Sequence, residues 1–434
     1  MRWQRLTAQL VLLALVATPG PSSVANAQTL ARDVTQDTYE SARLILPYAF
    51  YSDSLRLAGG VAGGRSANFS ETDVLFGALM ATTNRSFAAL GSASGVRVPW
   101  TRRFFLEGVF SLGRYTDQRL YGSRLPFDGP NRPGSNGSDP DDFISGEGRD
   151  DWAFLRLQYI LPLGAMRDDP VARYVLDKGL LVEGATGTGA FNPLNSGRTK
   201  IELEPFYQRR SFDEDEDLST FAGNGLRLRL DYDNTDFIRN PSRGSHVKLT
   251  ASHDFGALDS DGSWTTWEIE GTTHVDLGSS WAMRQNVLAL NAWTIDTPSW
   301  QVEERGPVDV IDGRPPPFEG ASLGGFFRMR AYPSDRFNDR AALYYSAEMR
   351  MIPAFNPLKG IAWLEPFDID WVQLVPFVEL GRVAPDWDLV ELHKDLQWDV
   401  GTGLRFMAER SVLRLDLAVG PEGFGATAMV AHPF

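Results

Sequence analysis

The chain has 434 residues, 41 glycines, no cysteine and a formal net charge of −14. The absence of cysteine excludes a disulfide framework, thiolate catalysis and a cysteine-ligated metal. The excess of acidic groups repels phosphate backbones, so we expect no nucleic-acid partner.

The N-terminal residues have the pattern of a secretory signal peptide. Arg2 and Arg5 provide a positive start, residues 10–17 form a short apolar stretch, and Ala25-Asn26-Ala27 is an A-x-A cleavage site. We therefore expect a signal peptide over residues 1–27, a mature chain beginning near Gln28, and a short N-terminal segment over residues 28–53.

Beyond this segment the sequence contains no apolar run of about 18 residues, the length that a transmembrane helix requires. A secreted soluble protein and a closed β-barrel both remain open. The mean hydropathy of −0.24 does not separate them, because a transmembrane barrel places every second residue of each strand in a polar lumen.

Several segments alternate apolar and polar residues with a period of two. Alternation is continuous from Leu396 to Phe406 and recurs over residues 226–233, 343–351 and 412–419. A helix cannot produce this pattern. The charged residues on the second face indicate that water lies on that side.

The length of these segments favours a membrane protein over a soluble sandwich. Strands of soluble proteins usually run about 5 to 6 residues, whereas a tilted strand that crosses a bilayer needs about 9 to 11. Sixteen candidates of this kind can be counted, an even number, as a bacterial antiparallel barrel requires. The sequence therefore predicts an all-β fold, a 16-stranded antiparallel transmembrane β-barrel, as a single domain over residues 54–434. The candidate strands are residues 54–64, 73–83, 86–98, 103–115, 152–161, 178–189, 199–210, 220–234, 244–256, 264–277, 281–294, 340–352, 369–384, 396–408, 412–419 and 424–434.

One long acidic stretch conflicts with this count. Residues 117–151 are rich in Gly, Asp, Asn and Pro, a composition typical of a loop outside the cell. Counting back from the C-terminus places them on the periplasmic side. Either a strand near residues 41–51 has been missed, or this connection is periplasmic or fills the lumen.

The chain ends in Phe434, after a segment that alternates apolar residues. A terminal phenylalanine in this position resembles the C-terminal signal by which outer-membrane barrels reach their insertion machinery. The alternative is a chance phenylalanine.

A turn motif gives the first specific resemblance. The segment DYDNTDFIRNPSRGS ends a strand, breaks the ladder at Asn240-Pro241 and offers a positive φ at Gly244. On its own it is an ordinary hairpin turn. With Asp233 and Asn234 it resembles a periplasmic turn of the bacterial surface antigen family, the BamA/TamA superfamily.

Two further pieces strengthen the resemblance. Met329-Arg330-Ala331-Tyr332, on the long connection 295–339, is similar to the V-R-G-[FY] loop tip of that superfamily, with Ala331 in place of glycine. Residues 377–381, FVELG, are similar to its F-x-[DE]-x-G strand. The resemblance implies that this loop folds back into the lumen and that Arg330 meets Glu379.

Physical chemistry favours the same pairing. Phe377, Glu379 and Gly381 share one strand face, and a carboxylate in a confined lumen requires a cation. Arginine provides a bidentate partner and a face that stacks on an aromatic ring. We expect Arg330 to pair with Glu379, with Phe377 and Tyr332 packed beside them; the alternative is a solvated loop cation.

The resemblance also implies a function, a location and partners. It covers the whole barrel, and residues 28–53 are too short to hold the POTRA domains of BamA and TamA, so the sequence resembles a branch without them. It implies an integral protein of a Gram-negative outer membrane that assists membrane-protein insertion or translocation of a polypeptide or lipid. Expected partners are outer-membrane lipids, lipopolysaccharide, the barrel-insertion machinery during biogenesis and an unknown client. A passive pore is the alternative.

No enzymatic site is predicted. Gly320 to Gly324 match G-x-S-x-G around Ser322, but a nucleophile elbow requires a strand-to-helix turn. The five histidines lie far apart in sequence without a metal-ligand spacing, and we interpret them as belt or surface residues. No cofactor, metal or catalytic residue is expected. An outer-membrane hydrolase using Ser322 is the remaining, weaker hypothesis.

Overall fold

A computed structural model describes the chain over residues 31–33, 43–52, 56–66, 72–122, 131–187, 189–213, 220–305, 308–362, 364–365, 369–408, 411–430 and 432–434. The predicted signal peptide lies outside these residues. Within them, no helix is long and apolar enough to cross a membrane.

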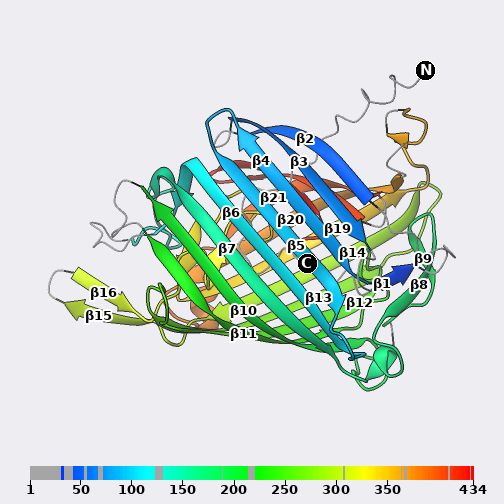
Figure 1. The fold of residues 1–434 in the computed structure, drawn as a ribbon, viewed down its shortest axis with the longest axis horizontal. Helices are drawn as coiled ribbons and strands as arrows, with labels where there is room; N and C mark the ends of the chain where they lie inside the picture. Colours follow the sequence, from blue (N-terminus) through cyan, green and yellow to red (C-terminus); the bar gives the residue numbers. More distant parts are fainter. Residues whose placement is uncertain are drawn as a thin grey trace.

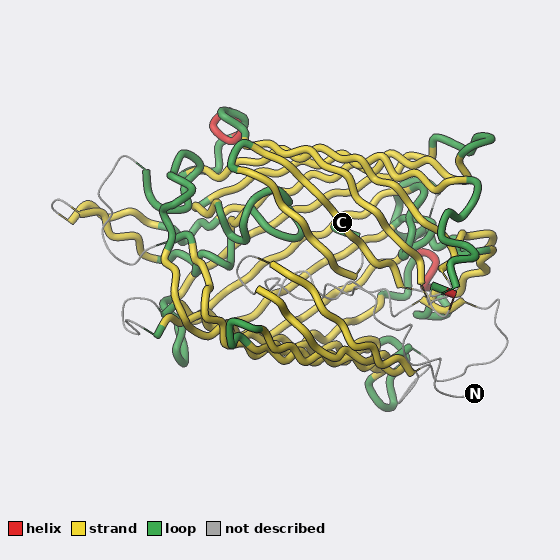
Figure 2. The backbone as a smooth tube through the Cα atoms, turned by 90° about the horizontal axis from the view of Figure 1, so that it is seen from above, coloured by secondary structure: helices red, strands yellow, loops and turns green. Residues whose placement is uncertain are grey.

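The described chain is dominated by one large sheet of sixteen strands. Neighbouring strands run antiparallel, and the sheet curls into a barrel-shaped wall (Figures 1 and 2). In sheet order the strands are β2 (Arg43–Ser52), β3 (Arg56–Ser66), β4 (Val74–Thr82), β5 (Phe87–Arg97), β6 (Phe104–Leu120), β7 (Ile144–Ile160), β10 (Arg198–Phe212), β11 (Phe221–Asp233), β12 (Gly244–Phe255), β13 (Ser263–Asp276), β14 (Met283–Asp296), β19 (Ala341–Pro353), β20 (Ile369–Ala384), β21 (Gln397–Ala408), β22 (Ser411–Gly420) and β23 (Gly423–Val430). Among the pairings of the described residues, none joins β2 to β23.

Three small sheets and two short helical turns complete the described elements. A three-stranded sheet contains β1 (Ala31–Asp33), β8 (Ala172–Asp177) and β9 (Leu180–Glu183). Two hairpins lie in the connection between β14 and β19: β15 (Gln301–Arg305) with β16 (Val308–Asp312), and β17 (Ala321–Leu323) with β18 (Phe337–Asp339). The helical turns are η2 (Gly164–Met166) and α2 (Leu389–Leu392).

The sequence prediction assigned two segments incorrectly with respect to the wall. Residues 178–189 were predicted as a membrane strand. They contain β9, which belongs to the small sheet with β1 and β8 and not to the wall. The wall begins with β2 at Arg43, inside the segment that we expected to precede the barrel. The sequence prediction therefore included one strand that lies outside the wall and omitted one that belongs to it, so the predicted set of strands was wrong at both places.

This correction resolves the conflict over residues 117–151. Residues 117–120 extend β6 and residues 144–151 extend β7, while residues 121–143 connect those two strands. With residues 178–189 removed from the wall, this connection lies at the same end as the long connection 297–340. We call this the loop end, and the opposite end, where β23 finishes, the tail end.

The wall has the polarity of an inverted soluble protein. On β11, the leucines Leu228 and Leu230 are 52% and 45% exposed, while Arg227 and Arg229, which alternate with them, are buried. Apolar side chains therefore cover the outside, and charged ones fill the interior, as the period-two pattern requires.

The tail end is covered by the connection 161–197. Trp371 of β20 donates its ring N–H to the carbonyl of Gly179 at 3.1 Å. Around this contact, an apolar cluster joins the rim of the wall to the small sheet through Phe105, Ile160, Met166, Val171, Ala172, Tyr174, Phe237, Ile352, Trp371, Met407 and Val412. The cluster explains why the hairpin β8–β9 folds across the end of the barrel instead of joining the wall.

Candidate functional site

The connection 297–340 folds back into the interior and forms the candidate site. Its tip is a tight turn, with Met329 at φ 59° and Gly324 at φ 117°. A Cβ on Gly324 would lie 2.1 Å from the carbonyl oxygen of Pro333, so glycine is required where the two arms of the loop meet. This geometry presents Arg330 to the inner face of β19–β22.

The side chain of Arg330 is completely buried and contacts three carboxylates. Its guanidinium lies 3.1 Å from Glu379, 3.1 Å from Glu348 and 2.7 Å from Asp416. The guanidinium carbon lies 3.4 Å from the centre of the Phe377 ring. The structure thus brings together the arginine, acid and aromatic residue that the motifs singled out.

Backbone groups of the same tip also bind the wall. The backbone N–H of Arg330 donates to Glu379 at 2.7 Å, and that of Ala331 donates to Asp399 at 3.0 Å. The Tyr332 hydroxyl donates to the carbonyl of Trp398 at 3.1 Å. The carboxylates therefore fix the backbone of the tip as well as its cation.

The motifs did not reveal the full extent of this cluster. Tyr344 donates its hydroxyl to Glu379. Arg405 and Arg350 pair with Glu348 at 2.7 and 2.9 Å, and Arg414 lies 3.3 Å from Asp416. The cluster contains four arginines, Arg330, Arg350, Arg405 and Arg414, and four acids, Glu348, Glu379, Asp399 and Asp416, so their formal charges balance. This balance matters because an unpaired buried charge is strongly destabilising.

Two glycines of the wall leave room for the loop tip because they have no side chain. A Cβ on Gly381 would lie 2.9 Å from Leu323 and 3.1 Å from the sulfur of Met329. A Cβ on Gly420 would lie 3.3 Å from the Cβ of Ala331. The tip thus accommodates alanine, where the similar motif has glycine, against a glycine of the wall.

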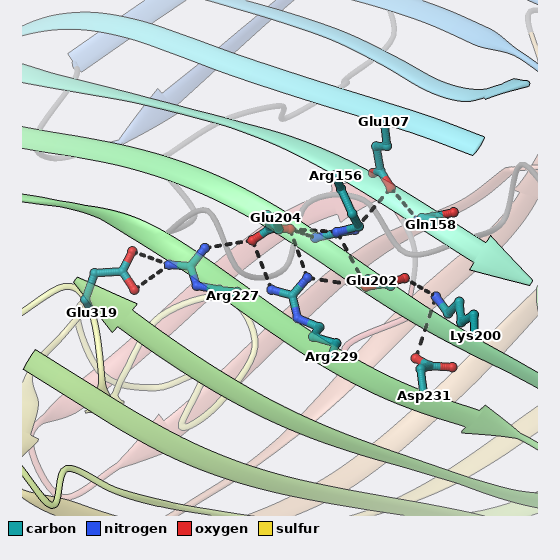
Figure 3. A network of polar contacts seen from close by, with 10 residues as sticks. All are labelled: Glu107, Arg156, Gln158, Lys200, Glu202, Glu204, Arg227, Arg229, Asp231 and Glu319. Atoms are coloured by element: carbon teal, nitrogen blue, oxygen red, sulfur yellow. Dashed lines mark hydrogen bonds and ion pairs between the residues drawn. The ribbon is translucent and has the colours of Figure 1, made fainter. Parts of the chain in front are cut away.

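The same loop has a second anchor on another part of the wall (Figure 3). Glu319 accepts from Arg227 of β11, with both carboxylate oxygens 2.6 Å from the guanidinium. Arg227 also pairs with Glu204 of β10 at 2.8 Å, and Arg156 of β7 pairs with Glu204 at 2.6 Å. The network continues along the inner face through Glu107, Gln158, Lys200, Glu202, Arg229 and Asp231.

Further contacts hold the returning arm of the loop near the loop end. Arg336 pairs with Glu422 at 2.7 Å and donates to the carbonyl of Ser138 at 2.7 Å. Asp335 lies 3.5 Å from Arg210. Burial raises the pKa of Asp335, and Arg210 opposes that rise. The loop is therefore bound to β7, β10 and β11 through their charged network and to β19–β22 through Arg330, and it bridges the interior.

The predicted periplasmic turn lies at the tail end, between β11 and β12. Asp233 accepts from the backbone of Thr235 at 2.9 Å, and Asn234 accepts from the hydroxyl of Ser196 at 2.6 Å. Asn240, which precedes Pro241, donates to Gln285 at 2.8 Å. A Cβ on Gly244, at φ 102°, would lie 2.2 Å from the carbonyl oxygen of Asn234. These residues form one compact turn.

Asp236 is a member of this turn that the motif did not single out. Its carboxylate accepts from the backbone N–H groups of Phe237 and Ser242, both at 2.9 Å. Its position between Asn234 and Asn240 in the sequence was the only available signal.

The C-terminus differs from the predicted strand 424–434, because β23 ends at Val430. His432 lies 2.7 Å from Arg405 and 3.0 Å from the carbonyl of Arg239. The Phe434 ring lies 5.1 Å from the guanidinium carbon of Arg350. Pro433 has no N–H to continue a ladder, and its neighbours find partners inside the barrel.

Two histidines contradict the expectation of belt or surface positions. His432 is 6% exposed and His274 is 5% exposed. His274 lies 3.1 Å from Arg350. Both belong to the interior, next to the balanced cluster.

Ser322 lies in a small hairpin and helps to hold the loop together. It lies on β17, which pairs with β18, and not at a strand-to-helix turn. Its hydroxyl donates to Asp335 at 3.0 Å. The G-x-S-x-G pattern is therefore not a nucleophile elbow.

Comparison with known proteins finds similar solved structures but no similar sequence. No family model and no curated protein sequence matches this chain. Among solved structures, CdiB from Escherichia coli aligns with a TM-score of 0.51 and 11% identity, over 90% of this chain and 61% of that chain. The chain shares the fold of CdiB. BamA from Haemophilus ducreyi lacking POTRA domains 1–3 aligns with a TM-score of 0.44 and 13% identity, over 90% of this chain and 70% of that chain.

Proposed function

We propose that the chain is an outer-membrane β-barrel of the BamA/TamA type that assists insertion or translocation of a polypeptide or lipid-like client. In this proposal the sixteen strands close between β2 and β23, and the barrel spans the outer membrane of a Gram-negative bacterium. The fold shared with CdiB and the loop-tip and turn motifs support the assignment. Fold alone does not establish function, and further support comes from the outer face of the wall and from the loop inside it.

The outer face supports placement in a membrane. Exposed apolar residues recur on neighbouring strands, including Leu228, Leu230, Leu249, Trp267 and Ile269. A soluble protein rarely exposes so continuous an apolar surface. Lipids and lipopolysaccharide are the partners that this face fits, and Phe434 serves in biogenesis as the insertion signal.

The single observation that favours a client-handling role over a passive pore is the bridged interior. The loop binds Arg227 on β11 through Glu319 and binds carboxylates of β19, β20 and β22 through Arg330. A steady aqueous pathway would have to pass this buried, charge-paired bridge. An insertase or translocase needs no permanent opening, and its loop can move when a client is present.

Two measurements test the proposal. In a planar bilayer, the purified protein is expected to carry little steady current, and Arg330→Ala is expected to raise the current by releasing the loop. Arg149→Ala is the matched control, because the Arg149 side chain is 58% exposed. In cells, deletion is expected to change the protein or lipid content of the outer membrane. Steady current in the unaltered protein, with an unchanged membrane after deletion, would support the passive pore instead.

A further inference from the structure

A groove of about 640 Å³ crosses the outside of the wall. It is lined by residues of β12, β13, β14, β19 and β20, and by Phe191 from the connection that covers the tail end. No charged residue belongs to the lining of the groove. The groove lies apart from the loop and from both of its anchors.

The register of the strands explains the hollow shape. One row of directly paired residues crosses the wall through Val247, Gly271, Ala292, Tyr345 and Leu380. The two smallest residues, Gly271 and Ala292, lie next to each other in this row, with Val247 on one side and Tyr345 and Leu380 on the other. A Cβ built on Gly271 would meet no atom within 4 Å. The row is therefore a trough with an open floor.

An aromatic pair closes one end of the trough. Val247 pairs with Tyr232 of β11, and the Phe191 ring lies edge-on to Tyr232 with the ring centres 4.8 Å apart. Phe191 is 55% exposed, although it belongs to a connection that otherwise covers the end of the barrel. This connection thus places an exposed aromatic ring against the outer wall beside the groove.

We propose that this groove holds one acyl chain of a membrane lipid. The proposal rests on the membrane placement proposed above. Four strand spacings separate Val247 from Leu380, which gives roughly 19 Å at ~4.8 Å per spacing, the scale of an extended lipid chain. The volume lies within the range of about 300–1,000 Å³ found for small-molecule sites.

The shape of the groove distinguishes a retained chain from the lipids that cover the rest of the wall. A chain on a flat surface contacts protein on one side only. In the trough it contacts the floor at Gly271 and Ala292 and the flanking side chains of Leu290 and Val378 as well. Dispersion energy grows with the number of such contacts, so this chain should exchange more slowly than its neighbours.

Photocrosslinking tests the proposal. The protein is reconstituted in nanodiscs of phosphatidylethanolamine that carries a diazirine in one acyl chain, and the adducts are mapped by mass spectrometry. Adducts are expected to concentrate on Phe191, Leu290 and Val378. Filling the trough with Gly271→Leu or Ala292→Leu should reduce them roughly tenfold, equivalent to ~1.4 kcal/mol. Ala251→Leu on β12, outside the groove lining, is the matched control and should leave them unchanged.

The outcomes separate this proposal from the placement in the membrane. Adducts spread evenly over the outer wall, or unchanged by both filling variants, would overturn the groove and leave the membrane placement intact. Failure of the unaltered protein to enter the nanodisc would overturn the membrane placement and the groove with it. Because Ala292→Leu and Gly271→Leu fill the trough from different strands, a folding defect in one leaves the other as the test.

Discussion

Gly425 of β23 lies directly against the backbone of Arg330. A Cβ on Gly425 would come within 2.1 Å of the Arg330 carbonyl oxygen and 3.0 Å of the Cα of Ala331. The obstacle is backbone and cannot rotate away. The last strand of the wall and the tip of the loop therefore share one close contact, and the position of either constrains the other.

Replacing Gly425 by alanine is expected to displace the loop tip from β23. The added methyl group has no space, and overpacking of this kind typically costs about 1–3 kcal/mol. Urea unfolding in lipid vesicles should show that loss in the free energy of unfolding. Gly271→Ala is the matched control, since its new Cβ would meet nothing within 4 Å. Equal stability of the two variants would show that the contact is dispensable.

The geometry of Arg330 predicts that its charge alone is insufficient. Arg330→Ala leaves Glu348, Glu379 and Asp416 without their shared cation, and breaking a buried pair typically costs ~3–5 kcal/mol. Arg330→Lys keeps the charge but loses the planar fork and the stacking on Phe377, so we expect an intermediate loss.

A double-mutant cycle with Glu379→Ala checks this interpretation. If Arg330 and Glu379 act as one unit, the cost of the double variant should fall well below the sum of the single costs. Additive costs would mean that the two residues stabilise the barrel independently. The unfolding free energies of all four proteins in the cycle provide the measurement.

The second anchor predicts a local effect on the loop. Glu319→Gln removes the charged partner that Arg227 contacts with two bonds of 2.6 Å, while Glu204 still binds Arg227. A lost hydrogen bond to a charged group contributes about 1.5–3 kcal/mol. Limited proteolysis should therefore cleave the connection 297–340 faster in this variant. Glu183→Gln, an exposed change at the tail end, should leave the cleavage rate unchanged.

The sequence predicted which face of each strand turns inward more reliably than which inward groups meet. Alternation placed Glu348 and Arg350 on the charged face of their strand, and the structure buries both. It could not indicate that Glu348 would meet Arg405 or the tip arginine, because those contacts depend on strand register and on the path of the loop. The FVELG and MRAY motifs identified Arg330 and Glu379 only through family resemblance.

The errors in strand assignment have a similar physical origin. β2 reads RLILPYAFYS and carries apolar residues on both faces, so alternation does not reveal it. β9 reads LLVE, and this apolar sequence resembles the start of a membrane-spanning strand. Its place was decided by tertiary packing, through contacts such as Trp371 with Gly179, which no local pattern contains.

The C-terminal tail offers a test that separates two roles of Phe434. In the structure its ring lies 5.1 Å from the guanidinium of Arg350, a contact of the kind that contributes about 0.5–2 kcal/mol. Phe434→Ala should therefore lower the unfolding free energy of purified, refolded protein by that amount, and Phe434→Tyr should retain it. A residue that acts only as an insertion signal would behave differently: refolded Phe434→Ala would be as stable as the unaltered protein, and only its assembly in cells would fall. Measuring stability in vitro and the amount of folded barrel in cells on the same variants distinguishes the two, because the contact with Arg350 exists only after folding, whereas a signal acts before it.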